Sequence, residues 1–261
     1  MVNKLRSALL EDRLTLGTWL QIGHPAVAEI LAHVGFDWIC VDLEHGIIDL
    51  ETMANIFRAI GAYGTVPVAR LPLNDPIWIR RSLDAGARGL IIPMISSAEE
   101  IEMAIRYAKY PPRGERGYGY SRANAYGMDF ENYIAEANEA IAIIAQIEHK
   151  NGIENIDSIL QVQDLGGVFI GPLDLSGSYG KTGQLDCPEM KEALQRYLSS
   201  CREHKKCAGI HIIRPDEHSI QNAINQGYKM IALGVDDVFL EMASNSALKR
   251  AKHILNGKFT I

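Results

Sequence analysis

Hydrophobic residues along the chain gather in eight short runs that are separated by longer stretches of mixed character. Within the runs apolar and polar residues do not alternate, as they would in a strand with one face in water. Each run is therefore expected to be a strand covered on both faces, which is typical of parallel sheets. The runs are Leu16–Leu20, Trp38–Val41, Val66–Ala69, Leu90–Ile92, Ala140–Ile147, Val168–Ile170, Ala208–Ile213 and Met230–Leu233.

The stretches between the runs begin with residues that favour helix starts, either N-cap side chains or prolines of a first helical turn. These residues are Asp49, Asp75 with Pro76, Ser97 with Glu100, Pro188 and Pro215. Strand and helix patterns that alternate eight times predict a (β/α)8 barrel, with the whole of 1–261 as a single domain. A doubly wound parallel sheet is the alternative.

Composition narrows the possible partners and the compartment. The chain has 261 residues and a formal net charge of −6, so it has no basic excess to neutralise nucleic-acid phosphates. Its four cysteines form no C-x-x-C pair, which favours a reducing, cytoplasmic setting. The N-terminal residues are too polar for a secretion signal, and no apolar run is long enough to span a membrane.

One irregular stretch, Tyr110–Tyr133, is rich in Gly, Tyr and Arg. Loops of this length are uncommon in compact domains and often serve as lids or binding loops. A surface insertion or a contact between subunits explains the composition equally well. Arg122 in this stretch is a candidate contact for an acidic substrate, or alternatively a residue that holds the loop by a salt bridge.

Polar residues follow nearly every predicted strand. In a (β/α)8 barrel all strands end at the same rim, where the chemistry of such barrels takes place. The strand-end residues are Gln21, Asp42, Glu44, His45, Arg70, Gln146, Glu148, His149, Asp174, His211 and Asp236.

Two acids of this set, Glu148 and Asp174, follow neighbouring strands. Carboxylates brought close together repel each other unless a cation lies between them. Oxygen ligands without Cys or paired His suit Mg²⁺ or Mn²⁺. Gln146 shares the strand face of Glu148, whereas His149 should point away and is interpreted as structural. Two solvated acids are the competing interpretation of the pair.

His45 and Arg70 are the candidate base and the candidate cation. A nearby carboxylate, such as Asp42 or Glu44, would raise the basicity of His45, although a lone histidine is often structural. Arg70 shares the barrel-filling face of its strand, so its charge needs an anion. That anion is a substrate carboxylate, a developing enolate, or one of the strand-end acids in a structural salt bridge.

Nucleotide cofactors and Schiff-base chemistry lack support. The glycines of Gly171–Gly180 do not have the spacing of a nucleotide fingerprint, and no lysine ends a strand. Backbone N–H groups near Leu173 and Asp174 are instead candidates to bind a small carboxylate.

The segments VDLEHG, VPVARLP, LDAGARGLIIPM, AQIE and IGPLDLS together resemble the HpcH/HpaI aldolases, which are metal-dependent (class II) pyruvate aldolases. The resemblance runs from Gly17 to about Gly234 in the same order. It implies a barrel of the phosphoenolpyruvate/pyruvate type, assembled as a homo-hexamer (a trimer of dimers) with the last helix, Asp237–Leu255, swapped between subunits. It also implies a divalent ion: Mg²⁺, Mn²⁺ or Co²⁺.

Site roles follow from the resemblance position by position. Glu148 and Asp174 match the metal ligands, His45 the general base and Arg70 the residue that stabilises the enolate. Gln146, Asp174 and the backbone of Leu173 match substrate contacts. Asp84 matches an acid that raises the basicity of the histidine, which leaves Asp42, Glu44 and Arg122 as candidate supporting residues.

The implied reaction is reversible retro-aldol cleavage of a 4-hydroxy-2-oxo acid, such as 4-hydroxy-2-oxoheptanedioate, to pyruvate and an aldehyde. Family members of this kind serve the catabolism of aromatic compounds. Three alternatives remain: a C–C lyase acting on an acyl-CoA, a Schiff-base aldolase, and a barrel that binds a small acid without catalysis. The aldehyde and the physiological ion are left open.

Overall fold

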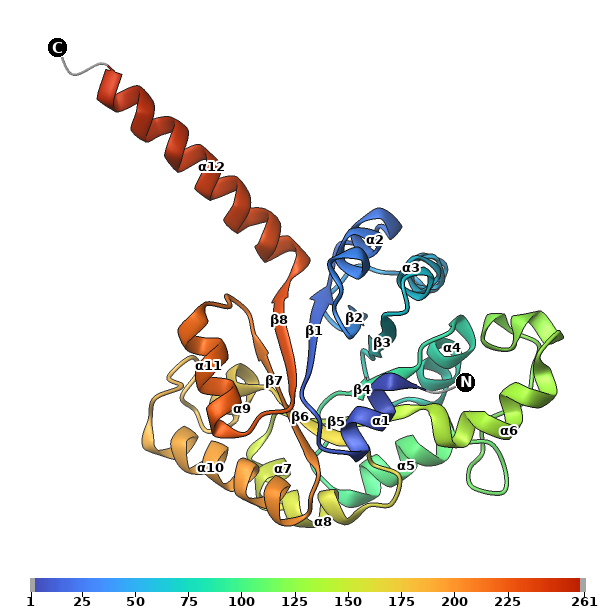
Figure 1. Ribbon diagram of the computed structural model, residues 1–261. Helices are drawn as coiled ribbons and strands as arrows, with labels where there is room; N and C mark the ends of the chain where they lie inside the picture. Colours follow the sequence, from blue (N-terminus) through green and yellow to red (C-terminus); the bar gives the residue numbers. More distant parts are fainter. Residues whose placement is uncertain (1–2, 259–261) are drawn as a thin grey trace.

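A computed structural model describes residues 3–258 and contains eight parallel strands that close into a barrel (Figure 1). Each strand pairs with the next in the sequence, and β8 pairs with β1. The strands are β1 (Thr15–Leu20), β2 (Trp38–Asp42), β3 (Val66–Arg70), β4 (Gly89–Ile92), β5 (Ala142–Ile147), β6 (Gly167–Ile170), β7 (Cys207–Ile212) and β8 (Met230–Val235). The prediction of a (β/α)8 barrel is confirmed, and a doubly wound sheet is wrong.

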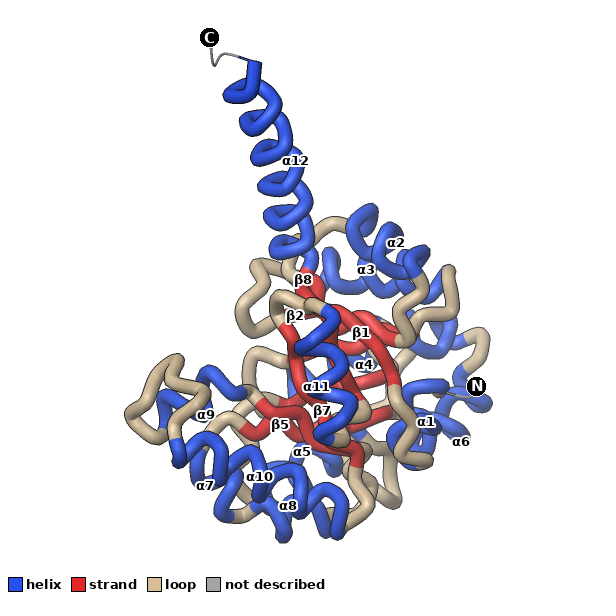
Figure 2. The backbone as a smooth tube through the Cα atoms, turned by 60° about the vertical axis from the view of Figure 1, so that its left-hand side comes forward, coloured by secondary structure: helices blue, strands red, loops and turns tan. Residues whose placement is uncertain are grey.

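Helices surround the barrel, as the two views of the backbone show (Figures 1 and 2). They are α1 (Lys4–Leu10), α2 (Pro25–Val34), α3 (Leu50–Ala62), α4 (Pro76–Ala85), α5 (Ala98–Ala108), η1 (Arg122–Gly127), α6 (Phe130–Ala140), α7 (Lys150–Glu154), α8 (Ile156–Gln161), α9 (Pro172–Ser178), α10 (Pro188–Glu203), α11 (Glu217–Gln226) and α12 (Asp236–Lys258). The loops from strand to helix form one rim of the barrel, and the loops from helix to strand form the other.

Most predicted helix starts are confirmed. The side chains of Asp49, Asp75 and Ser97 accept backbone N–H groups of the first turns of α3, α4 and α5. Pro215 does not begin a helix: α11 begins two residues later, because Asp216 provides the N-cap. The fifth apolar run is also shorter than predicted, since Ala140 is the last residue of α6 and β5 begins at Ala142.

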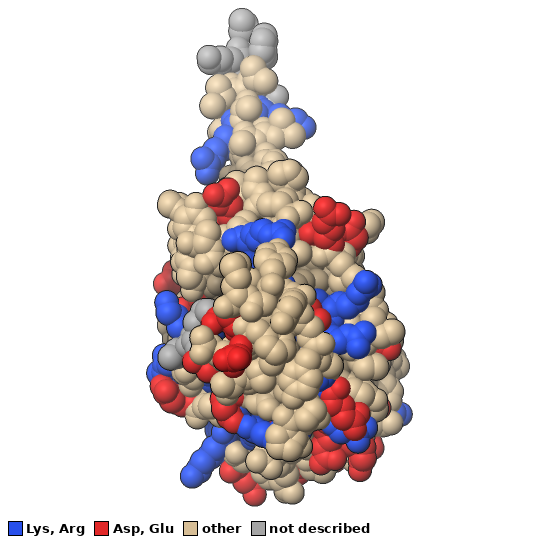
Figure 3. All heavy atoms as spheres, turned by 90° about the vertical axis from the view of Figure 1, so that its right-hand side faces the viewer, with Lys and Arg blue, Asp and Glu red and all other residues tan. Residues whose placement is uncertain are grey.

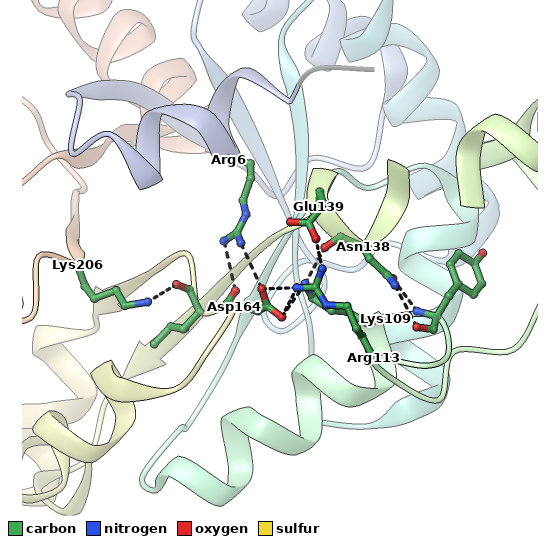
Figure 4. Close-up of polar contacts among 9 residues, drawn as sticks. Arg6, Lys109, Arg113, Asn138, Glu139, Asp164 and Lys206 are labelled. Atoms are coloured by element: carbon green, nitrogen blue, oxygen red, sulfur yellow. Dashed lines mark hydrogen bonds and ion pairs between the residues drawn. The ribbon is translucent and has the colours of Figure 1, made fainter. Parts of the chain in front are cut away.

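A polar network lies near the starts of the strands, at the end of the barrel opposite the strand-to-helix loops (Figure 4). Asp164, just before β6, accepts two hydrogen bonds from Arg113, at 2.7 and 2.6 Å. Lys109 Nζ lies 3.0 Å from the same carboxylate, and Arg6 of α1 donates to the Asp164 carbonyl at 3.2 Å. Lys109 is buried, so Asp164 supplies the negative charge that its ammonium group needs. The network fastens α1 across this end of the barrel.

The irregular stretch Tyr110–Tyr133 is more ordered than predicted, because it contains η1 and the start of α6. Arg122 donates to the carbonyls of Ala85 and Phe57, at 2.9 and 3.3 Å, and so holds the stretch against α4 and α3. Ala85 ends α4, close to the start of β4 and remote from the strand ends. In the described part of this one chain, Arg122 therefore makes no contact at the strand-end rim and no salt bridge, contrary to both expectations for its side chain.

Helix α12 extends away from the barrel, and its side chains from Leu240 to Leu255 are all exposed (Figure 1). Helix α12 includes Asp237–Leu255, the segment that was predicted to be swapped between subunits. Within residues 3–258, no helix is long and apolar enough to cross a membrane. On the face drawn in Figure 3, basic and acidic side chains are interspersed over the body of the molecule and form no continuous basic surface.

Candidate active site

Five charged side chains of the strand-to-helix rim influence one another: Asp42, Glu44, Arg70, Glu148 and Asp174. Asp42 and Arg70 are the last residues of β2 and β3, which pair with each other directly. Glu44 follows β2, Glu148 follows β5, and Asp174 lies in the first turn of α9 after β6. The barrel therefore brings together residues that are far apart in the sequence.

Arg70 and Asp42 form a buried ion pair. Arg70 Nε and Nη2 donate to the two oxygens of Asp42, at 2.9 and 2.7 Å. Burial alone would raise the pKa of Asp42, but hydrogen bonds and charge from Arg70 outweigh it, so that pKa is lowered. In the same way, burial would lower the pKa of Arg70, but its pairing with Asp42 raises it. Both groups are therefore charged, and a bidentate pair fixes the plane of the guanidinium.

Arg70 also contacts Glu44, with 2.8 Å between Nη1 and Oε2. The structural salt bridge, left open by the sequence, is thus present. A guanidinium has five N–H donors. These contacts do not use all of them, so Arg70 can still donate to a substrate. Burial is the main cause of a raised pKa at Glu44, and Arg70 and His45 partly offset it.

Asp42 also fixes the loop that carries His45. Its Oδ1 accepts the backbone N–H groups of Glu44 and His45, at 3.1 and 3.3 Å, while its Oδ2 accepts from the Gln21 side chain at 2.7 Å. Asp42 therefore contacts the backbone of His45 and not its ring. Within residues 3–258 the exposed ring of His45 has no hydrogen-bond partner.

Asp84 lies elsewhere. It is in the last turn of α4, and its carboxylate accepts from Arg116 at 2.7 Å. His45 follows the carboxyl end of β2, whereas the end of α4 leads to the start of β4, so the two residues occupy opposite rims. Within residues 3–258 of one chain Asp84 therefore makes no contact with His45, and its expected effect on the basicity of His45 stays a prediction.

Glu148 is 3% exposed, and its Oε2 accepts the Met94 N–H at 3.1 Å. Its other oxygen accepts from the side-chain amide of Gln146. Burial raises the pKa of Glu148 to about 7; the Met94 hydrogen bond opposes this, and Glu44 and Asp174 add to it. Gly171 makes room for this carboxylate, because a Cβ at that position would lie 2.7 Å from Glu148 Cγ.

The charge of Asp174 raises the pKa of both Glu44 and Glu148, so the three carboxylates lie close enough to repel one another. Asp174 and Leu173 are exposed and belong to the first turn of α9, whose N–H groups have no partners within a helix. A buried acid crowded by two others favours a cation, and oxygen donors favour Mg²⁺ or Mn²⁺. Glu148 and Asp174 thus fit a divalent ion. Among the described residues no group of three or more His, Cys, Asp or Glu could hold a metal ion. An ion held by Glu148 and Asp174 would take its other ligands from water and substrate.

Two strand-end histidines are structural in different ways. His149 is the N-cap of α7, and its Nδ1 accepts the Asn151 N–H at 3.2 Å, which agrees with the predicted structural role. His211 of β7 stacks on Trp19, with 5.1 Å between ring centroids and 5° between planes. The Arg70 guanidinium carbon lies 4.2 Å from the Trp19 ring centroid. Sequence reasoning missed Trp19, because an aromatic residue inside an apolar strand gives no polar signal.

Comparison with known proteins identifies the family to which the chain belongs. The sequence model of the HpcH/HpaI aldolase/citrate lyase family matches residues 15–242. A 4-hydroxy-2-oxo-heptane-1,7-dioate aldolase from Klebsiella pneumoniae subsp. pneumoniae is 35% identical, over 97% of this chain and 95% of its own.

Solved structures are similar over nearly the full length. An HpcH/HpaI aldolase/citrate lyase family protein from Burkholderia cenocepacia J2315 has a TM-score of 0.92 and 33% identity, covering 96% of this chain and 100% of its own. The citrate synthase SbnG has a TM-score of 0.85 and 28% identity, covering 97% of this chain and 98% of its own. The chain belongs to the HpcH/HpaI aldolase/citrate lyase family and is a carbon–carbon lyase.

Proposed function

We propose that the protein is a divalent-metal-dependent (class II) aldolase. It cleaves a 4-hydroxy-2-oxo acid, such as 4-hydroxy-2-oxoheptanedioate, reversibly to pyruvate and an aldehyde. The observation that carries the proposal is the rim cluster, in which a buried Arg70 lies among carboxylates that include Glu148 and Asp174, neither of which forms an ion pair within residues 3–258. The name of the 35%-identical Klebsiella protein supports this class of substrate.

Glu148 and Asp174 would hold the ion, which when bound would polarise the keto oxygen of a 2-oxo acid as a Lewis acid. The chain itself supplies the contacts around it. The N–H groups of Leu173 and Asp174, which no helical carbonyl accepts, are placed to bind the substrate carboxylate. Gln146 donates to Glu148 and so holds that carboxylate in one orientation.

The proton transfers are assigned to His45, whose exposed ring is free of other hydrogen bonds among the described residues. In the cleavage direction His45 takes the proton of the C4 hydroxyl, and the O–H electron pair forms the aldehyde carbonyl at C4. The C3–C4 bond breaks, and its electron pair forms the enolate between C3 and the C2 oxygen. Arg70 donates to the enolate oxygen and lowers the energy of that charge. Return of a proton to C3 gives pyruvate.

We further propose that the enzyme is a homo-hexamer in the cytoplasm, with residues 1–261 as one domain and α12 swapped between subunits. The side chains of α12 from Leu240 to Leu255 are exposed within one chain, which supports the packing of this helix on another subunit. All four cysteines are free, which supports a reducing compartment. In such an assembly Asp84 could act on His45 only from a neighbouring subunit, because the two lie at opposite rims of a single barrel.

Because the structure is similar to that of a citrate synthase, a reaction on an acyl-CoA is the main alternative to the proposed aldol cleavage. Pyruvate release from 4-hydroxy-2-oxoheptanedioate, followed with lactate dehydrogenase and NADH, separates the two. The proposal expects release that stops with EDTA and returns with Mg²⁺, Mn²⁺ or Co²⁺. Condensation of oxaloacetate with acetyl-CoA in place of pyruvate release would contradict it. Borohydride trapping of pyruvate on the protein would instead indicate a Schiff base.

A further inference from the structure

Gln21 is a strand-end residue to which the proposed reaction gives no role. It follows β1, and its side-chain amide donates to Asp42 Oδ2 at 2.7 Å. The same oxygen accepts from Arg70 Nη2 at 2.7 Å, while Oδ1 accepts from Arg70 Nε and from the backbone of His45. Gln21 therefore bonds the carboxylate that holds both the candidate enolate-stabilising cation and the loop of the candidate base.

The orientation of the Asp42 carboxylate depends on these donors. Asp42 is fully buried, and the terminal torsion of an aspartate has no sharply preferred angle, so hydrogen bonds fix the plane of the carboxylate. The N–H groups of the following loop bond Oδ1, and Gln21 bonds Oδ2 from the side of β1. Removal of the Gln21 amide takes a donor from Oδ2 alone, so we expect the carboxylate to turn and to move the Arg70 guanidinium with it.

The backbone of Gln21 is held in turn by Asp236, the first residue of α12. Asp236 is 5% exposed; its Oδ1 accepts the Gln21 N–H and its Oδ2 accepts the Ile22 N–H, both at 2.9 Å. Oδ1 also accepts the N–H of Asp237, at 3.1 Å. Strands β1 and β8 pair side by side, and α12 follows β8 directly (Figure 1). The Asp236 carboxylate thus joins the loop after β1 to the start of α12.

The loop after β1 also packs against the loop that carries His45. A Cβ at Gly23 would lie 3.4 Å from the side chain of Ile48 and 3.5 Å from the carbonyl oxygen of Ile47, so the two loops are in contact. Ile47 and Ile48 follow His45 by two and three residues. A shift of the loop after β1 would therefore reach His45 by packing as well as through Asp42.

We propose that Gln21 and Asp236 are positioning residues of the proposed reaction. Asp236 fixes the backbone of Gln21, Gln21 fixes the plane of the Asp42 carboxylate, and Asp42 orients Arg70 and the loop of His45. The first turn of α12 is thereby connected to the candidate active site. This inference rests on the proposed function and adds two residues that act on the reacting groups through Asp42.

The test uses the metal-loaded enzyme and the exchange of pyruvate methyl protons with deuterium, whose rate against pyruvate concentration gives kcat and KM. Gln21→Met keeps the length of the side chain and removes its donor, and Asp236→Asn replaces one acceptor oxygen by a donor. We expect each to lower kcat by about tenfold, the lower end of the range for a hydrogen bond to a charged group. KM and the Mn²⁺ affinity measured by calorimetry should stay within about twofold, because Arg70 acts on the enolate whereas Glu148 and Asp174 hold the ion.

The double variant tests whether the two residues act along one series of contacts. Because Asp236 acts on Asp42 through Gln21, Gln21→Met combined with Asp236→Asn should lower kcat clearly less than the product of the two single losses; independent effects would multiply. Asp37→Asn is the matched control. Its carboxylate accepts the Leu16 N–H of β1 at 2.8 Å, near the opposite end of the same strand, so its loss should leave kcat unchanged.

Unchanged kcat in a folded Gln21→Met protein would overturn the inference, as would a loss of Mn²⁺ affinity in parallel with kcat or a fully multiplicative double variant. Gln21 is partly exposed, so Gln21→Met decides the question by itself if Asp236→Asn does not fold. Each of these results leaves the aldolase proposal intact, provided the wild type exchanges the protons. A wild type that exchanges none with any divalent ion would overturn the aldolase proposal and this inference together.

Discussion

Replacing Gly171 by alanine tests whether the position of the Glu148 carboxylate controls the site. An ideal Cβ at residue 171 would lie 2.7 Å from Glu148 Cγ and 2.8 Å from Oε1. Non-bonded carbon atoms prefer about 3.5–4.0 Å. The carboxylate must therefore withdraw by about 1 Å, since the backbone of Gly171 is held by a 3.0 Å hydrogen bond from its N–H to the Ile147 carbonyl.

A displacement of about 1 Å at a reacting centre costs on the order of 10²-fold in rate, which is about 2.7 kcal/mol of transition-state stabilisation. We expect Gly171→Ala to lower kcat/KM by that amount. Disturbing the support of a metal ligand typically weakens metal binding by about 10- to 100-fold, so Mn²⁺ titrated by calorimetry should bind correspondingly less tightly.

Gly177→Ala is the matched control, because it lies in the same helix α9 and its Cβ would meet only Thr182 Oγ1, at an ordinary 3.6 Å. This variant should keep wild-type metal affinity and gain up to about 1 kcal/mol of stability from lower backbone entropy in the unfolded chain. Unchanged Mn²⁺ affinity in a folded Gly171→Ala protein would refute the argument that Glu148 holds the ion.

Three further predictions address separate parts of the molecule. The raised pKa of Glu148 means that the folded, EDTA-treated protein holds a proton up to about pH 7 that the unfolded chain releases near 4.3. Its free energy of unfolding should therefore fall by up to about 3 kcal/mol as pH rises through that interval; chemical denaturation of Glu148→Gln should lack this component. Asp164→Asn leaves buried cations unpaired and should lower the free energy of unfolding by about 3 kcal/mol without changing kcat. Asp157→Asn, at a half-exposed position, should cost less than about 1 kcal/mol. Arg122→Ala should raise the KM for acidic and neutral aldehydes equally, because its guanidinium bonds backbone carbonyls; a rise confined to acidic aldehydes would place Arg122 in a substrate site.

The sequence predicted the barrel because eight runs lacked the alternation of half-exposed strands, and a closed parallel sheet covered by helices is the arrangement that buries them. It also placed Asp42, Arg70 and Glu148 correctly, since a strand-end residue of a parallel barrel has only one rim available. The role of Asp84 stays a prediction, because a family motif does not state from which rim, or from which subunit, an acid acts. Arg122 was misjudged because loop contacts depend on tertiary packing, which has no local pattern.

Other parts of the site had no sequence signal at all. Trp19 resembles any buried strand aromatic, and its stack with His211 depends on strands β1 and β7, which are far apart in the sequence. The N–H group that Glu148 accepts belongs to Met94, which adopts a left-handed conformation with φ of 57°. A non-glycine residue seldom adopts that conformation, so propensity could not predict it.

Deuterium exchange into the methyl group of pyruvate, followed by NMR, tests the central claim most directly, because it needs no knowledge of the aldehyde. The account predicts no exchange in EDTA, exchange after addition of Mg²⁺, Mn²⁺ or Co²⁺, and loss of that exchange in both Glu148→Ala and His45→Ala proteins that remain folded. Absence of exchange from the wild type with every ion would contradict the proposed enolate chemistry. Exchange that persists in His45→Ala would contradict the assignment of the base.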